Sequence, residues 1–303
     1  MPNNAVQEYL SRKFRRLLSG APDGQPPWLA QVAAGNDPGL FLPSDAPWIV
    51  HRDFATLVGG IRALLLQAMH PGALNGVSQH SRYEEDPLGR LSGTIRWLTV
   101  TTFGSLEAVA QEANRVNRMH DRVKGSYVDK SGVEQKYQAS DPELLLWVHI
   151  AFMDSFLRSH QLYSRAEIPG GADAYVNLWG RSVEPLGLKS VPASEEDLLK
   201  VMSNFEEDLN CDDKALSVIR WIKNAPLPRT AKPVYALLFQ AALASLPADI
   251  QNKIGIKQLP IWLLRPLVTN LLALMRFAIG PDSPIEDAAL ARLRRLGAIG
   301  DIQ

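Results

Sequence analysis

Apolar residues recur at the helical spacing of three to four positions along most of the chain from Phe54 onward. The strict alternation of a half-buried strand is not sustained, and we find no Asn-Gly or Asp-Gly hairpin signal. Clusters of Pro and Gly separate the helical runs at 20–27, 35–47, 169–171, 225–233 and 280–284. The pattern predicts an all-α protein with about a dozen helices in a single globular domain.

The first fifty residues differ from the rest because Pro and Gly are frequent in them. They predict an N-terminal arm with short helices over 1–50, followed by a helical body over 51–303, and the two form one domain. Near the start, basic residues such as Arg12 are interleaved with Leu10 and Phe14, which predicts an amphipathic surface helix. We favour a helix docked on the body, and peripheral contact with a membrane stays open.

A helix is predicted from Pro87 to Gly104, with Asp86 as its N-cap and the glycine as its stop. Arg90 and Thr94 share one face of it because they are four residues apart. Such a pair suits a clamp for a carboxylate or a small ligand. The simpler alternative is that Arg90 pairs with Asp86 and that Thr94 faces solvent or bonds to its own helix.

The next helix is predicted from Ser105 to Gly125. Its apolar stripe recurs at spacings of four, three, four and three residues and consists of Val109, Ala113, Val116, His120 and Val123. His120 therefore lies within the apolar face. A histidine in that position is more often a hydrogen-bonded core residue than a ligand, but neutral imidazole is also the commonest metal ligand.

A third helix starts at the sequence Ser-Asp-Pro-Glu, residues 140–143, which combines a cap with a proline in the first turn. It is apolar nearly all round, so it is predicted to lie at the centre of the fold. One face of it carries His149, Met153, Phe156 and His160. The adjacent glycines of Val58-Gly59-Gly60, inside an earlier helical run, are expected to allow close helix packing rather than to bind phosphate.

The most hydrophobic stretch runs from Leu259 to Gly280 and is interrupted by Arg265, Pro266, Asn270 and Arg276. Charges are costly at the centre of a membrane span, so we predict a buried helix broken near Pro266 and no transmembrane segment. The N-terminus lacks the apolar run of a signal peptide. A cytoplasmic protein is therefore expected.

Charge and cysteine content exclude several classes. The 32 basic and 32 acidic residues balance, whereas a general nucleic-acid binder would carry a basic excess. The single cysteine, Cys211, excludes a disulfide framework and a multi-cysteine metal site. The carboxylates that follow it disfavour a thiolate ligand.

The six histidines leave few metal sites open: they are His51, His70, His80, His120, His149 and His160. A zincin motif, paired Glu-x-x-His motifs, glycine-rich phosphate loops and a Gly-x-Ser-x-Gly elbow are all missing from the sequence. A facial triad of His149, Asp154 and His160 stays open on spacing alone.

Several short motifs together resemble a known family. They are His70-Pro71, Asp86-Pro87-x-Gly89-Arg90-x-x-x-Thr94, His120-x-x-Val123-x-Gly125 and Asp141-Pro142-x-x-x-x-Trp147-Val148-His149. Each motif is weak alone, but the combination, from Trp48 to Trp179, is similar to the MpaB-family oxygenases. That family is related to the bacterial latex-clearing proteins, which cleave polyisoprene oxidatively.

The resemblance implies a helical domain that encloses a pocket for non-covalently bound haem b and activates dioxygen. Carried over to this chain, it makes His120 the proximal iron ligand, which would be its metal-binding residue. It places Arg90 and Thr94 on the other side of the haem, as catalytic and cofactor-binding residues. His149 is expected to be a further residue of the cofactor pocket.

Two departures from the family pattern bear on the reaction. Rubber-cleaving members carry a lysine just before the threonine, which can ligate the iron, whereas this chain has Gly93. Those members are secreted, whereas the N-terminus of this chain lacks the apolar run of a signal peptide. A polymer outside the cell is therefore not the expected substrate here. We expect a haem b-dependent oxygenase or oxidase that acts on a small, largely apolar molecule with dioxygen or peroxide. The alternative is a haem- or lipid-binding helical protein without turnover.

Overall fold

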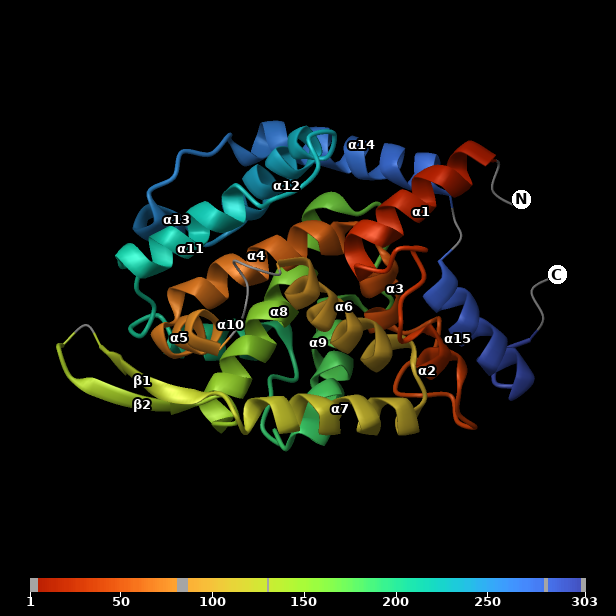
Figure 1. Cartoon of the computed structure of the whole chain (residues 1–303), viewed down its shortest axis with the longest axis horizontal. Helices are drawn as coiled ribbons and strands as arrows, with labels where there is room; N and C mark the ends of the chain where they lie inside the picture. Colours follow the sequence, from red (N-terminus) through yellow and green to blue (C-terminus); the bar gives the residue numbers. More distant parts are fainter. Residues whose placement is uncertain (1–4, 81–86, 130, 281–282, 301–303) are drawn as a thin grey trace.

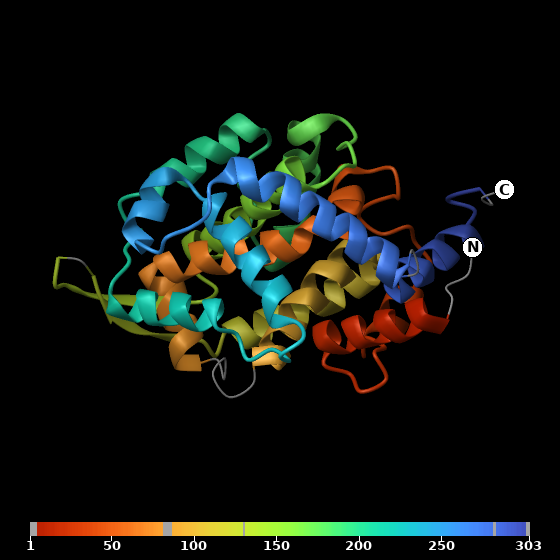
Figure 2. The same cartoon turned by 90° about the horizontal axis from the view of Figure 1, so that it is seen from above.

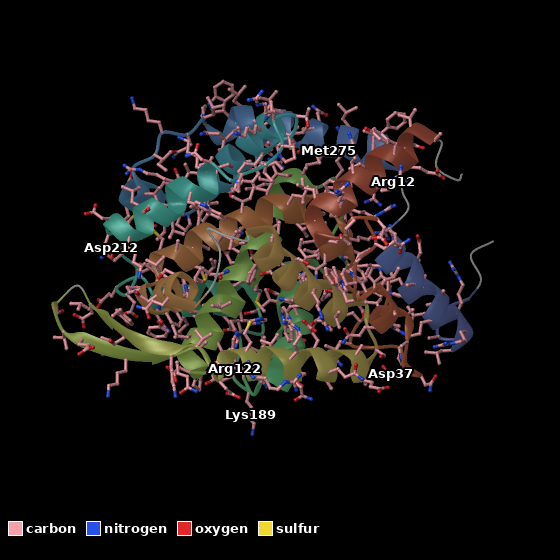
Figure 3. All side chains as sticks on the ribbon, viewed as in Figure 1. Arg12, Asp37, Arg122, Lys189, Asp212 and Met275 are labelled. Atoms are coloured by element: carbon pink, nitrogen blue, oxygen red, sulfur yellow. The ribbon has the colours of Figure 1, made fainter. Side chains whose placement is uncertain are left out.

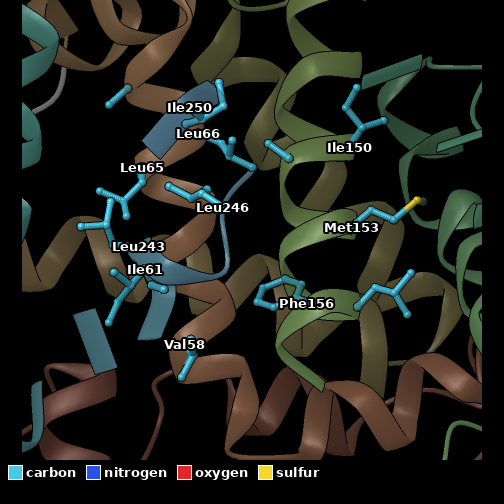
Figure 4. Close-up of a cluster of buried hydrophobic side chains, with 14 of the residues drawn as sticks. Val58, Ile61, Leu65, Leu66, Ile150, Met153, Phe156, Leu243, Leu246 and Ile250 are labelled. Atoms are coloured by element: carbon cyan, nitrogen blue, oxygen red, sulfur yellow. The ribbon is translucent and has the colours of Figure 1, made fainter. Parts of the chain in front are cut away.

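Two long helices packed against each other form the centre of the molecule: α4 (Ala55–Met69) and α8 (Pro142–Tyr163). In this computed structural model, residues 5–80, 87–129, 131–280 and 283–300 are described. Figure 4 shows apolar side chains of α4 and α8 meeting those of the neighbouring helices in one cluster. A Cβ atom on Gly59 would lie 2.7 Å from the ring of Phe156, so only glycine allows this approach. The predicted packing role of the glycine pair is thus confirmed at Gly59.

The other helices cover this pair on two sides (Figure 1). Above α4 lie α11 (Asp213–Lys223), α12 (Lys232–Ala244), α13 (Ala248–Ile254) and α14 (Ile261–Ile279). Below it lie α6 (Pro87–Phe103), α7 (Leu106–His120), α9 (Gly171–Gly180) and the 3-10 helix η1 (Arg181–Leu186). The remaining helices of the body are α5 (Pro71–His80) and α10 (Glu195–Asn204). The all-α prediction is confirmed, with fifteen α-helices in the described parts of the chain.

The two ends of the chain meet in a second, smaller core. The N-terminal segment forms α1 (Ala5–Ser19), α2 (Leu29–Ala33) and α3 (Ala46–Arg52), and the C-terminal segment forms α15 (Pro284–Arg295). Trp28 and Trp48 of the first pack with Leu293 of the second and with Phe103 at the end of α6. The helix predicted near the start, α1, packs against α6 and α14. It is therefore docked on the body.

A β-hairpin was not predicted from the sequence. Strands β1 (Lys124–Val128) and β2 (Glu134–Gln138) pair antiparallel. Their turn depends on Asp129, whose carboxylate accepts hydrogen bonds from the backbone N–H groups of Ser131 and Val133, and on Gly132 with φ of 81°. This turn lacks the Asn-Gly or Asp-Gly pair of the commonest hairpins, so its signal is weak in sequence.

The hairpin also shortens α7. The sequence predicts this helix up to Gly125, but it ends at His120, and Gly125 instead pairs with Tyr137 across the hairpin. Its start is as predicted, because the Ser105 side chain accepts a hydrogen bond from the N–H of Ala108. Helices α6 and α8 begin at Pro87 and Pro142, as the proline signals predict. Asp86, the predicted cap of α6, lies outside the described residues.

The stretch near the C-terminus was predicted to be a buried helix that is broken near Pro266, and both of these points are wrong. Helix α14 runs unbroken through Pro266, and only Leu264, Val268 and Leu272 of it are buried. The helix is long and apolar enough to cross a membrane by length and composition, which is also true of many helices in soluble proteins. It lies along the upper edge of the molecule in Figure 1, and Figure 2 shows it crossing the near face.

Candidate functional site

The candidate site is built on the corner where α6 turns into α7. Gly104 forms the corner, and a Cβ atom there would lie 2.5 Å from the carbonyl oxygen of Val100. From this corner the two helices diverge (Figure 1), and α7 packs against η1, the 3-10 helix that follows α9. Thr94 lies on α6, and His120 is the last residue of α7. The predicted residues thus lie on the two arms of one helical corner.

His120 has one ring nitrogen that the described part of the protein leaves unused. Its side chain is half-buried, and its Nδ1 atom is buried without a hydrogen-bond partner among the described residues. Burial lowers the pKa of His120, with Asp121 opposing and Arg115 adding to the effect. The imidazole is therefore neutral at physiological pH, which is the form that binds metal ions.

Of the predicted pair Arg90 and Thr94 on α6, the structure describes the side chain of Thr94. Thr94 is half-buried and already interacts with another group of the protein. The side chain of Arg90 lies outside the described residues, so its predicted position opposite His120 stays a prediction. Between them, Gly93 has no atom within 4 Å of the place where a Cβ would stand. The space beside this glycine is open.

His149 is one of several buried polar side chains in the molecule that have an unused hydrogen-bonding atom. Its Nε2 atom has no partner in the part of the chain that the structure describes, and burial lowers its pKa to about 3. Its ring stacks on Trp179, with 6.4 Å between the ring centroids. The Nε1 atom of Trp179 and the hydroxyl oxygens of Thr101 and Ser182 are likewise buried and unpartnered. A buried polar group without a partner costs about 1–3 kcal/mol, so such a group suggests a ligand or ordered water.

His51 provides the contrast, because it is equally buried but fully satisfied. Its Nδ1 atom lies 2.8 Å from the hydroxyl of Thr102, and its Nε2 atom lies 3.0 Å from the hydroxyl of Tyr175. Burial, reinforced by His160, lowers its pKa to about 3. His51 is thus a structural residue that joins α3 to α6 and α9.

The facial triad left open by spacing is not assembled. The Asp154 carboxylate lies 2.6 Å from the guanidinium of Arg62 and 3.5 Å from that of Arg158. The His160 Nε2 atom lies 2.8 Å from the carbonyl oxygen of Ala166. Across the described residues, no group of three or more His, Cys, Asp or Glu side chains is placed to hold a metal ion. For Cys211, burial and Asp212 raise the thiol pKa, in line with the expectation against a thiolate.

A buried carboxylate beside the site was missed in the sequence. Glu112 is not part of the predicted apolar stripe of α7, yet its side chain is fully buried. It pairs with Arg96 of α6 at 2.8 Å and with Arg115 of its own helix at 2.5 Å. The pair with Arg96 ties α6 to α7 beyond the corner. The signal, an arginine on the preceding helix, becomes clear only when the two helices are placed together.

Comparison with known proteins identifies the family. Neither the curated proteins nor the solved structures gave a match. One family model does match, described as "ER-bound oxygenase mpaB/B'/Rubber oxygenase, catalytic domain". The match extends over residues 48–279, far more than half of the chain, and the chain therefore belongs to this family of oxygenases.

Proposed function

We propose that the chain is a haem b-dependent oxygenase that oxidises a small, largely apolar organic molecule with dioxygen or peroxide. The observation that carries the proposal is the buried, unpartnered Nδ1 atom of His120. Membership of an oxygenase family supports the class of reaction. The balanced charge of the chain favours an uncharged substrate over a strongly anionic one.

The donor set fits haem. The porphyrin itself supplies four nitrogen ligands to its iron, so a single neutral imidazole completes the binding from the protein side. His120 offers such an imidazole, since its pKa is lowered by burial. The buried, unpartnered Nε2 atom of His149 is a further nitrogen that could contact a bound group.

The residues of the chain would then have separate tasks. His120 would hold the iron, and bound haem would supply the activation of dioxygen. Arg90 would pair with a carboxylate of the cofactor or with the oxygen ligand, because a guanidinium forms charge-assisted hydrogen bonds. The Thr94 hydroxyl can donate one hydrogen bond to an oxygen atom. His149 stays neutral at physiological pH, since its pKa is about 3, and so would bind without carrying charge.

The first prediction tests the iron ligand. His120→Gly should weaken haem binding by on the order of a hundredfold or more, because the protein's nitrogen ligand is lost. Added imidazole should restore the wild-type Soret band, since it can occupy the space of the missing side chain. The measurement is a haem titration followed by absorption, with and without imidazole. Arg118→Ala, an exposed change on the same helix, is the matched control and should behave as wild type.

A wild-type spectrum in His120→Gly without imidazole would disprove the ligand assignment. The reaction class is tested separately, by oxygen consumption of the haem-loaded protein with isoprenoid, fatty-acid and aromatic compounds. Product formation that requires haem supports an oxygenase. Haem binding with no turnover of any compound would instead favour a non-catalytic haem-binding protein.

A further inference from the structure

Helix α14 exposes an apolar face to solvent. Four large side chains on it are strongly exposed, namely Trp262 (73%), Leu267 (46%), Leu274 (62%) and Phe277 (77%). Trp262 and Phe277 are fifteen residues apart, which is about four turns, so they lie on the same side of the helix. Single exposed apolar residues are ordinary, but a row of them along one helix marks an interaction surface.

We propose that this face of α14 binds the surface of an anionic lipid bilayer. The opposite face of the helix is fixed to the protein, because Leu264, Val268 and Leu272 are buried. A helix held in this way cannot leave the body to span a membrane. It can lie in the plane of the interface with its apolar side among the acyl chains, as amphipathic surface helices do.

The charge around the face matches an anionic surface. α14 and α1 lie side by side, and the Gln7 side chain donates a hydrogen bond to the carbonyl oxygen of Phe277. The two helices together carry six basic residues and one acidic residue, although the whole chain is neutral. Figure 3 shows Arg12 of α1 and Met275 of α14 along this edge of the molecule. Basic residues near a membrane are attracted to anionic lipid headgroups.

The polar residue within the apolar row is also consistent with this orientation. The Asn270 side-chain oxygen accepts a hydrogen bond of 2.6 Å from the guanidinium of Arg165. This contact satisfies part of the amide and brings a further positive charge to the rim. Exposed Arg265 lies on the flank of the same helix. The face therefore combines an apolar centre with a basic border.

The test is sedimentation with lipid vesicles made of phosphatidylcholine alone or mixed with phosphatidylserine. Wild-type protein should sediment with the mixed vesicles, less with phosphatidylcholine alone, and less again at high salt. The double variant Trp262→Glu, Phe277→Glu should bind the mixed vesicles more weakly by on the order of tenfold or more, since two aromatic side chains no longer enter the bilayer. The control Leu199→Glu, Val133→Glu adds the same charge at exposed apolar positions elsewhere and should bind as wild type.

A second set of variants tests the charges. Arg12→Gln, Lys13→Gln and Arg265→Gln combined should lower binding to the mixed vesicles to the level of phosphatidylcholine alone. Wild-type protein that stays in the supernatant with both vesicles would overturn the proposal. So would a concentration-dependent dimer in light scattering, without lipid, that the Trp262→Glu, Phe277→Glu variant abolishes, because the face would then belong to a second copy. Thermal melts show that the variants are folded.

Discussion

Buried histidines in this protein differ in their hydrogen-bond partners. His51 and His149 are both buried and both have a pKa of about 3. His51 is bonded at both ring nitrogens, whereas His149 has an unpartnered Nε2 atom and His120 an unpartnered Nδ1 atom. Burial alone therefore does not identify a candidate ligand. An unsatisfied ring nitrogen distinguishes His120 and His149 from His51. His160 has one as well, at Nδ1, although its Nε2 atom is bonded to the carbonyl oxygen of Ala166.

These pKa values predict that the protein loses stability in mild acid. A histidine with a lowered pKa is neutral in the folded state but takes up a proton when unfolded, so stability falls as the pH drops from 6.5 toward 3. At pH 5, His51 and His149 should each cost roughly 2 kcal/mol. Urea unfolding of the haem-free protein between pH 5 and 7 measures this slope. His149→Leu should make the slope shallower, and an unchanged slope would contradict the assignment.

Sequence patterns could predict which residues of α7 are buried, but not all of their partners. Val109, Ala113 and Val116 are buried as the stripe predicts, because each turn of a helix repeats the face of the last. Glu112 is buried too, and its partner Arg96 comes from another helix. A pattern within one helix has no access to charges that a second helix supplies.

At the scale of whole helices, an apolar sequence pattern likewise does not determine how much of a helix is buried. α8 and α14 are both strongly apolar, and both were predicted to be buried. α8 is at the centre because α4, α9, α10 and α14 surround it, whereas α14 is covered by its neighbours on one face only. Hydrophobicity predicts that a helix has an apolar face but not whether another element of the chain covers it.

Adjacent glycines of α4 give a matched pair for testing helix packing. Gly59→Ala should destabilise the protein by about 1–3 kcal/mol, because its Cβ would meet Phe156 at 2.7 Å and the backbone oxygen of Ser155 at 3.1 Å. Gly60→Ala has nothing within 4 Å and should stabilise the protein by about 0.5–1 kcal/mol through helix propensity. Denaturant unfolding of both variants checks the opposite signs. Equal effects would mean that α4 and α8 are not in close contact at Gly59.

For the molecule as a whole, one buried side chain joins the two ends of the chain. Arg292 of α15 donates hydrogen bonds to the carbonyl oxygens of Val32, Pro38 and Phe103. Burial lowers its pKa, with Asp37 opposing and Arg295 adding to the effect. The sequence predicts an N-terminal arm but not the hydrogen bonds that join it to Arg292. Every residue has a backbone carbonyl group, so such acceptors leave no signal in the sequence.

Replacing this arginine should loosen the second core. Arg292→Leu should cost about 3 kcal/mol or more, because the buried carbonyl groups of Val32 and Phe103 lose their donor. Arg294→Leu, at an exposed position of the same helix, should change stability by less than about 0.5 kcal/mol. Thermal unfolding measures both variants, and hydrogen exchange should show faster exchange in α2 for Arg292→Leu alone. Similar melting of the two variants would rule out a structural role for the buried guanidinium.

The second core, which joins the two ends of the chain, also affects the order in which a newly made chain can fold on the ribosome. Trp28, Val32 and Trp48 are synthesised early, but Ile285, Ala289 and Leu293, which cover them, come near the end. The central pair of α4 and α8 can form before α15 has left the ribosome. The cluster of tryptophans, in contrast, must wait for almost the whole of translation. During that interval its apolar surface is open to chaperones or to aggregation, as in other slowly completed folds.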